Sequence, residues 1–195
     1  MRKRIGWQKL INDKFNFPFL LKVNAQNKYG STPLHNARFS GNTDIVGLLL
    51  NHICIDANVV DNNGDTPLHL AVQNGNSDIV GLSLNHFGID ANVVVNNGDT
   101  VRVNAVDSYG SIPLHNACVS ENTHIVGLLL DNFGIDANVV VKNGKNYDNI
   151  PLHNACFSGN LHTVEILLSH SGIDAYVVVN NCDTPLNWTV QESML

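Results

Sequence analysis

Hydrophobic and polar positions recur along the chain in units that each contain two short apolar segments. The first segment begins with Pro-Leu-His, and the second is a run of Ile, Val and Leu that follows an Asn. In the second segment, apolar residues fall on more than one helical face, as in the stretch 45–50. A helix of this kind is typical of a repeat that packs between neighbouring copies. The pattern therefore predicts pairs of short helices stacked along an array.

The spacing of the units supports the same interpretation. The prolines of the repeated motif, Pro33, Pro67, Pro113, Pro151 and Pro185, are 34, 46, 38 and 34 residues apart. Segments 27–60 and 61–94 share 22 identities in 34 positions, and 23–60 and 103–140 share 26 in 38. A period of this length predicts an all-α repeat solenoid.

Helix boundaries can be predicted within each unit. Thr before Pro supplies an N-cap hydroxyl and a first helical residue with a suitable φ. Gly41, with Gly75 and Gly159 in register, is expected to end the first helix. The second helix is expected to be capped by the Asn that precedes it, namely Asn42, Asn76, Asn122 or Asn160. The connecting stretch 89–98 is β-branched and ends in Asn-Gly, which favours a hairpin.

These residues resemble ankyrin repeats, whose Thr-Pro-Leu-His-x-Ala signature is matched in full by 32–37 and 66–71. The resemblance extends over residues 23–195 and implies stacked helix-turn-helix units with projecting β-hairpin fingers. The repeats are expected at about 27–60, 61–94, 107–140 and 145–178, with a truncated one at 179–195. Residues 1–22 form a basic N-terminal segment that could be a degenerate cap.

Three irregularities interrupt the pattern. An insertion at 95–106 predicts a longer finger or loop and a local weakness in the stack. A surplus of four residues lies within 142–149. Val95, Val141 and Val179 stand where the ankyrin pattern has an Asp, as at Asp61. Loss of that turn acceptor is expected to leave apolar, β-prone finger tips exposed.

Composition and charge limit the classes of partner. The 195 residues are 44% apolar and 14% charged, which indicates a folded soluble chain without a membrane-spanning run. Residues 1–30 carry a net charge of +6 and the remainder carries −12, so the body is a poor match for nucleic acid. Four cysteines without CxxC pairs favour a reducing compartment. We expect a cytoplasmic protein, with the nucleus as an alternative.

The recurrent histidines are candidates for chemistry. His35, His69, His115 and His153 share one register, which allows general bases or metal ligands. The ankyrin resemblance instead implies a structural role, with Thr32 and Thr66 as hydroxyl partners that Ile112 and Ile150 remove. The pairs His115–Cys118 and His153–Cys156 leave a zinc-stabilised variant as an alternative. Phosphate loops, nucleophile elbows and paired catalytic carboxylates are missing from the sequence, so no enzymatic activity and no cofactor are expected.

The same resemblance implies a protein partner of unknown identity, bound on the concave face. The finger tips and exposed first-helix positions that line this face are Lys28, Tyr29, Phe39, Ser40, Asn62, Asn63, Gln73, Asn74, Ser108, Tyr109, Val119, Ser120, Tyr147, Phe157 and Ser158. Five are aromatic, and aromatic residues are enriched in binding hot spots. Alternatively, some rings pack against the neighbouring finger. The sequence thus predicts an interaction module, with a spacer segment of a longer array as the alternative.

Overall fold

Each repeat unit forms a first helix that begins at the proline of its Pro-Leu-His motif. The computed structural model describes residues 22–86, 88–89, 111–120, 122–132, 135–143, 147–179 and 183–187. The first helices are α2 (Pro33–Ser40), α4 (Pro67–Gln73), α6 (Pro113–Val119) and α8 (Pro151–Phe157). The Thr32 hydroxyl accepts a hydrogen bond from the His35 amide at 3.4 Å, which satisfies one free N–H at the start of α2.

The ends of the first helices follow the predicted chemistry. Gly41 ends α2 in the left-handed region with φ 74°, a conformation that glycine adopts without a steric penalty. Gly75 and Gly159 have φ values of 67° and 68° at the same place in their units. The predicted glycine stops are therefore confirmed at these three positions.

The second helices are α3 (Thr43–Leu50), α5 (Ser77–Leu84), α7 (Thr123–Leu130) and α9 (Leu161–Ser169). Each begins after an Asn whose side-chain oxygen accepts a hydrogen bond from the amide three residues later. The donors are Ile45 at 3.0 Å, Ile79 at 3.1 Å, Ile125 at 3.2 Å and Thr163 at 3.0 Å. These bonds confirm the predicted N-caps.

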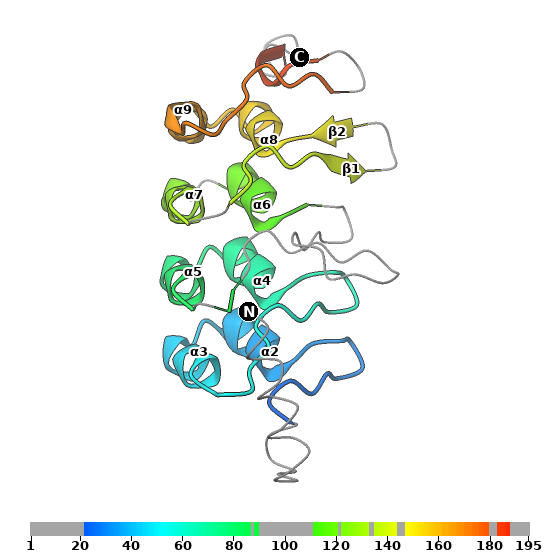
Figure 1. Cartoon of the computed structure of the whole chain (residues 1–195), viewed down its shortest axis with the longest axis vertical. Helices are drawn as coiled ribbons and strands as arrows, with labels where there is room; N and C mark the ends of the chain where they lie inside the picture. Colours follow the sequence, from blue (N-terminus) through cyan, green and yellow to red (C-terminus); the bar gives the residue numbers. More distant parts are fainter. Residues whose placement is uncertain are drawn as a thin grey trace, which may run out of the picture.

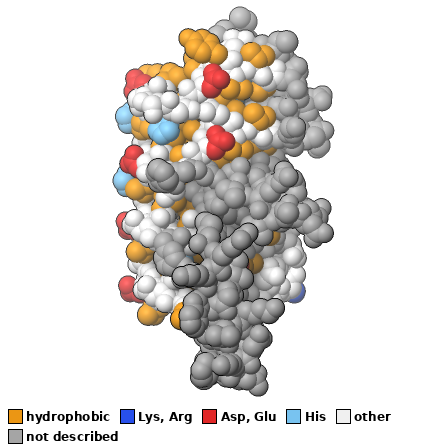
Figure 2. Space-filling view, in the orientation of Figure 1, with side chains coloured by type: hydrophobic (Ala, Val, Ile, Leu, Met, Phe, Trp, Pro, Cys, Tyr) orange, Lys and Arg blue, Asp and Glu red, His pale blue; other side chains and the backbone are white. Residues whose placement is uncertain are grey.

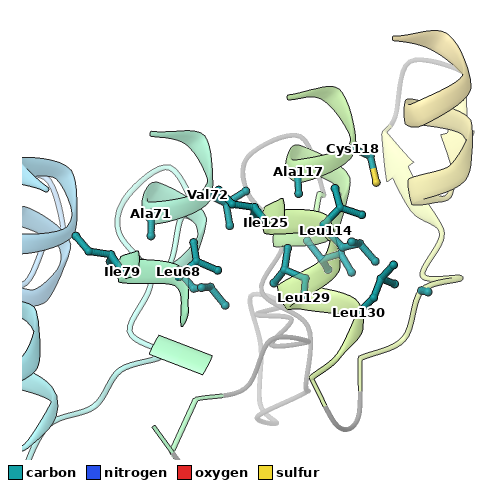
Figure 3. Close-up of a cluster of buried hydrophobic side chains, with 14 of the residues drawn as sticks. Leu68, Ala71, Val72, Ile79, Leu114, Ala117, Cys118, Ile125, Leu129 and Leu130 are labelled. Carbon is teal, nitrogen blue, oxygen red and sulfur yellow. The ribbon is translucent and has the colours of Figure 1, made fainter. Parts of the chain in front are cut away.

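The helices stack in two rows, with the fingers projecting on the side of the first helices (Figure 1). Each first helix packs on the next first helix, and each second helix on the next second helix. Leu34, Leu68, Leu114 and Leu152, which share one register, are at most 2% exposed. Val72 of α4 and Ile125 of α7 point toward each other across neighbouring units (Figure 3). The apolar surface is thus buried between units, and the described helices form the predicted all-α solenoid.

The two best-described fingers differ from each other in whether they contain strands. Strands β1 (Val141–Asn143) and β2 (Tyr147–Asn149) pair antiparallel, with Val141 opposite Asn149, in the stretch that carries the four surplus residues. Residues 59–66, between α3 and α4, contain no strand. There the Asp61 carboxylate accepts hydrogen bonds from the amides of Asn63 and Asp65 at 2.8 and 3.0 Å. The expected pair of strands is therefore not confirmed in this finger, where the carboxylate stabilises a tight turn.

The valines that replace this Asp are not exposed. Val141 is 3% exposed and Val179 is 8% exposed. The Val179 amide donates to the Asp183 carbonyl at 3.2 Å, as the Asp61 amide does to Asp65 at 2.9 Å. Val141 and Val179 are thus buried, contrary to the expectation, whereas Val140 and Val178 of the same valine runs are 41% and 59% exposed. Val95 lies outside the described residues.

The irregular stretches lie mostly outside the described residues, namely the N-terminal segment 1–21 and the insertion 95–106. The helices on either side of the insertion are nevertheless stacked, since α4 contacts α6 and α5 contacts α7. The local weakness in the stack that the insertion predicts is therefore not visible as a loss of contact between these helices. In the last unit, residues 185–187 form a short 3₁₀ turn. Among the helices described, none combines the length and hydropathy needed to cross a membrane.

Candidate functional site

One candidate surface runs along the last turns of the first helices. Phe39, Val119 and Phe157 occupy equivalent places and are 71%, 57% and 56% exposed. Gln73 holds this position in α4 and is also exposed, and its amide donates to the Asp65 carboxylate at 3.1 Å. Large apolar side chains that recur in register at the surface are the composition expected of a contact area. Figure 2 shows hydrophobic side chains gathered toward the C-terminal end of the array on the face it presents.

The polar residues that follow this column take part in the frame. The hydroxyls of Ser40 and Ser120 donate to carbonyls three residues earlier, at 2.9 and 2.8 Å. Ser158 donates to the Ala155 carbonyl at 3.0 Å and to the Cys118 carbonyl of the preceding unit at 3.2 Å. Asn74 is the C-cap residue of α4. The serine hydroxyls and the Asn74 backbone N–H therefore satisfy carbonyls at the helix ends.

The first two finger tips contact each other. The Asn62 amide donates to the Tyr29 carbonyl at 3.0 Å, and the Asn62 side chain donates to the Lys28 carbonyl at 3.2 Å. The Tyr29 ring is 62% exposed, and the Lys28 ammonium lies 4.9 Å from its centroid. Asn63 is exposed beside them. The structure thus brings Lys28, Tyr29 and Asn62 together and leaves the Tyr29 ring accessible.

Three of the other sequence-predicted positions are not placed. Ser108 and Tyr109 lie outside the described residues. The backbone of Tyr147 belongs to β2, but its side chain is also outside the description. The aromatic positions with described exposure are therefore Tyr29, Phe39 and Phe157.

The recurrent histidines are buried and bridge consecutive units. His35 Nδ1 accepts from the Thr32 amide at 3.1 Å and lies 2.8 Å from the Thr32 hydroxyl, while Nε2 lies 3.0 Å from the Asp65 carbonyl. Because a carbonyl can only accept, the proton resides on Nε2 and the ring is neutral. Burial lowers the pKa of His35 and outweighs the opposing effect of the Asp65 carbonyl.

The same bridge recurs in the other units. His69 reaches the Ser111 carbonyl at 3.0 Å, His115 the Asn149 carbonyl at 3.2 Å and His153 the Asp183 carbonyl at 3.5 Å. Where Ile112 and Ile150 replace Thr, the histidine still accepts from the backbone amide of that residue, at 3.4 and 3.3 Å. The backbone bonds of the bridge therefore do not require the hydroxyl.

This geometry bears on the zinc alternative. Both ring nitrogens of His115 and His153 face backbone groups, so metal ligation would break those bonds. Burial raises the pKa of the Cys118 thiol, and the neighbouring Cys156 raises it further, which disfavours thiolate ligands. Figure 3 shows Cys118 on the side of α6 that faces α8. Within the described part of the chain, no three His, Cys, Asp or Glu residues are grouped to hold a metal ion.

Sequence reasoning missed a ladder of asparagines. Asn24 donates to the Cys54 carbonyl at 2.7 Å and accepts from the Asp56 amide at 2.9 Å. These partners are 30 and 32 residues away from Asn24 in the sequence. Asn138 makes the corresponding bonds to Gly172 and Asp174. The recurrence of Asp-Ala-Asn, as at 136–138, was the available signal for Asn138, while Asn24 lies outside that motif. Its contacts could not be read from the sequence, because the partners lie in the loop of the following helix pair.

Arg38 was also missed. It is fully buried, and its Nε, Nη1 and Nη2 atoms have no hydrogen-bond partner in the described structure. Burial lowers the pKa of its guanidinium to about 9. Val72, Cys118 and Cys156 hold this register in the other units, and all are buried. An arginine therefore occupies an apolar position of the core without a counter-charge among the residues that the structure describes.

A groove of about 740 Å³ lies at the ends of α3 and α5, where its lining includes His52, Cys54 and His86. His52 Nδ1 accepts from the Cys54 amide at 3.2 Å and so serves the turn. Asp56 also lines the groove but accepts from the Asn58 amide at 3.0 Å. These engaged groups provide no arrangement of nucleophile and base.

Comparison with known families agrees with this architecture. A family model described as ankyrin repeats (3 copies) matches residues 9–97 and 93–178. The chain therefore belongs to the ankyrin-repeat family, whose members are generally protein–protein interaction modules and typically non-enzymatic. A search of curated proteins returned no match to the chain.

Proposed function

We propose that this chain binds a protein partner through the concave face formed by its finger tips and first helices. The observation that carries the proposal is the exposed column of Phe39, Val119 and Phe157, which are each more than half exposed at equivalent positions. Regular stacking does not require large apolar groups there, since Gln73 holds the same place in α4. Tyr29 adds an exposed ring at the first finger tip.

The mechanism is the rigid display of side chains on a repeating frame. Histidine bridges and asparagine bonds fix each unit against the next. Binding a partner should therefore cost little conformational entropy in the backbone of the array. Aromatic rings have few rotatable bonds and supply a large contact area. Affinity is therefore expected to depend on the rings more than on the serines, whose hydroxyls are engaged within the frame.

The test uses the intact chain as bait in its native extract, followed by affinity measurements with the captured protein. Phe39→Ser and Phe157→Ser are each expected to weaken binding by about tenfold or more, equivalent to about 1.4 kcal/mol. The matched control is Leu48→Ser, which removes a leucine that is 74% exposed on the second-helix row.

Circular dichroism and thermal unfolding should be unchanged in all three variants, since the side chains are exposed. Binding that survives both Phe substitutions would contradict the proposal. Loss of binding together with loss of the fold would favour a packing role for the rings. A chain that captures no specific protein would favour the spacer alternative.

A further inference from the structure

The last second helix, α9, carries an apolar seam that no described helix covers. Leu161, Val164 and Leu168 are spaced by three and four residues, which places them on one stripe of the helix. Leu161 is 70% exposed and Leu168 is 46% exposed. In Figure 1, α9 ends the row formed by α3, α5 and α7.

The same seam is covered in the earlier helices. Leu50 and Leu130 correspond to Leu168 and are each 6% exposed. Val46, Val80 and Val126 correspond to the half-buried Val164 and are fully buried. Each of those helices has another second helix packed after it in the row. The seam of α9 therefore has the composition of an established helix–helix interface.

Leu161 adds apolar area that stacking inside the chain does not use. The equivalent first residues of the earlier helices are Thr43, Ser77 and Thr123, which are small and polar. A leucine there gains nothing while it faces water, but it contributes once a surface covers it. The departure from the repeat occurs at the one described second helix without a successor in the row.

We propose that this seam binds an amphipathic helix from a partner protein, placed as α7 is placed on α5. In that packing, Ile125 and Leu129 of α7 are fully buried, so the partner helix needs a branched aliphatic residue and a leucine four positions apart. Glu165 lies between Leu161 and Leu168, and its side chain is 63% exposed. A lysine or arginine on the partner helix would complement it.

A second copy of the chain fits this surface poorly. Its α3 would supply Ile45, which is 46% exposed, but the adjacent Asp44 would bring a like charge toward Glu165. The row of first helices is also already occupied beyond α8, since His153 Nε2 lies 3.5 Å from the Asp183 carbonyl at the start of the last turn. A second α2 therefore has no place to stack. This inference does not depend on the concave-face proposal, which involves other residues.

The probe is a stapled helical peptide with the sequence of residues 122–132, whose natural face packs on α5. One version carries His124→Lys. Its equivalent in α9, His162, lines the groove at Gly127 of α7, and Gly127 is in register with Glu165. A matched version carries His124→Glu. A third version adds Ile125→Asp to the lysine peptide. Fluorescence anisotropy measures the binding of each peptide to the full chain.

The lysine peptide is expected to bind saturably and at least about threefold more tightly than the glutamate peptide at low salt. Ile125→Asp should abolish its binding. Leu161→Thr in the chain, which restores the residue of Thr43 and Thr123, should weaken binding by about tenfold. Leu48→Ser is the control for an exposed leucine elsewhere and should leave binding unchanged.

Circular dichroism checks that each variant of the chain remains folded. No saturable binding of the lysine peptide would overturn the proposal. It would also be overturned by an equal loss in Leu161→Thr and Leu48→Ser, or by no loss in Leu161→Thr. Equal affinities for the lysine and glutamate peptides would overturn the basic character assigned to the partner.

Discussion

Replacing Arg38 by methionine removes an uncompensated cation from the core and should stabilise the protein. The side chain is fully buried, and three of its nitrogens lack partners within the described structure. Each buried donor without a partner costs about 1–3 kcal/mol. Methionine keeps an unbranched stem that fills the space, and replacing buried charges by apolar groups of similar volume often gains about 1–4 kcal/mol. We therefore expect the free energy of unfolding to rise by about 2–4 kcal/mol.

Urea unfolding followed by circular dichroism measures the total change. Hydrogen exchange of α2 and α3 measures the local change, because units of a repeat array can open separately. Two controls separate charge from packing. Arg38→Lys retains a buried cation and should gain nothing. Leu48→Met changes an exposed side chain and should stay within about 0.5 kcal/mol of the wild type.

The pH dependence gives an independent check. Burial lowers the pKa of Arg38 to about 9 from its ordinary value of 12.5. Above pH 9 the folded state loses this proton before the unfolded state does, so the unfolded state binds more protons and stability rises with pH. The wild type should therefore approach Arg38→Met in stability as the pH rises above 9. A stability loss of about 1 kcal/mol or more in Arg38→Met would refute the reasoning, because it would require a favourable partner for the guanidinium.

Four further predictions each concern the surroundings of a single residue. Thr163→Val should raise the free energy of unfolding by about 1 kcal/mol in urea titrations, because the buried Thr163 hydroxyl has no partner in the described structure. Gly81→Ala should add about 1 kcal/mol, since an added Cβ meets no atom within 4 Å and alanine favours the helix, and thermal unfolding measures it. Lowering the pH from about 7.5 to about 5.5 should reduce the unfolding midpoint, and less so in His35→Gln, because burial lowers the pKa of His35 and the unfolded ring takes up the proton first. Asn138→Ala should cost about 1–2 kcal/mol and speed hydrogen exchange at the Asp174 amide, which donates to the Asn138 side-chain oxygen, but not at the Gly172 amide, which donates to His170.

The helix boundaries could be predicted because the chemistry that sets them is local. Thr32, Asn42 and Gly41 act within four residues of their own position, so sequence spacing contains the necessary information. Burial of the leucines in register followed from the repeat itself. The period also fixed the order of the helices in each row.

Contacts between units and departures from the repeat were harder to predict. The Asn138 bonds span 34 and 36 residues, and Val179, whose amide donates to the Asp183 carbonyl, is buried where its replacement of Asp predicted exposure. Of the candidate binding residues, the exposed Phe39 and Phe157 could be placed by register. The two hydrogen bonds of the Ser158 hydroxyl could not be predicted, because one of the two accepting carbonyls belongs to the neighbouring unit. The sequence shows only that Arg38 replaces a small residue in its register. The burial of its guanidinium without partners depends on side chains from other helices.

The histidine bridges give the array a direction. Each imidazole N–H reaches forward to a carbonyl of the following unit, from His35 to Asp65 and from His153 to Asp183. Deleting a unit at either end would expose one half of a bridge, a ring N–H or a backbone carbonyl, which water can satisfy. The direction instead decides what an added unit has to bring. A unit joined at the C-terminal end has to offer a carbonyl in the place of Asp65, and a unit joined at the N-terminal end has to offer a histidine in the place of His35.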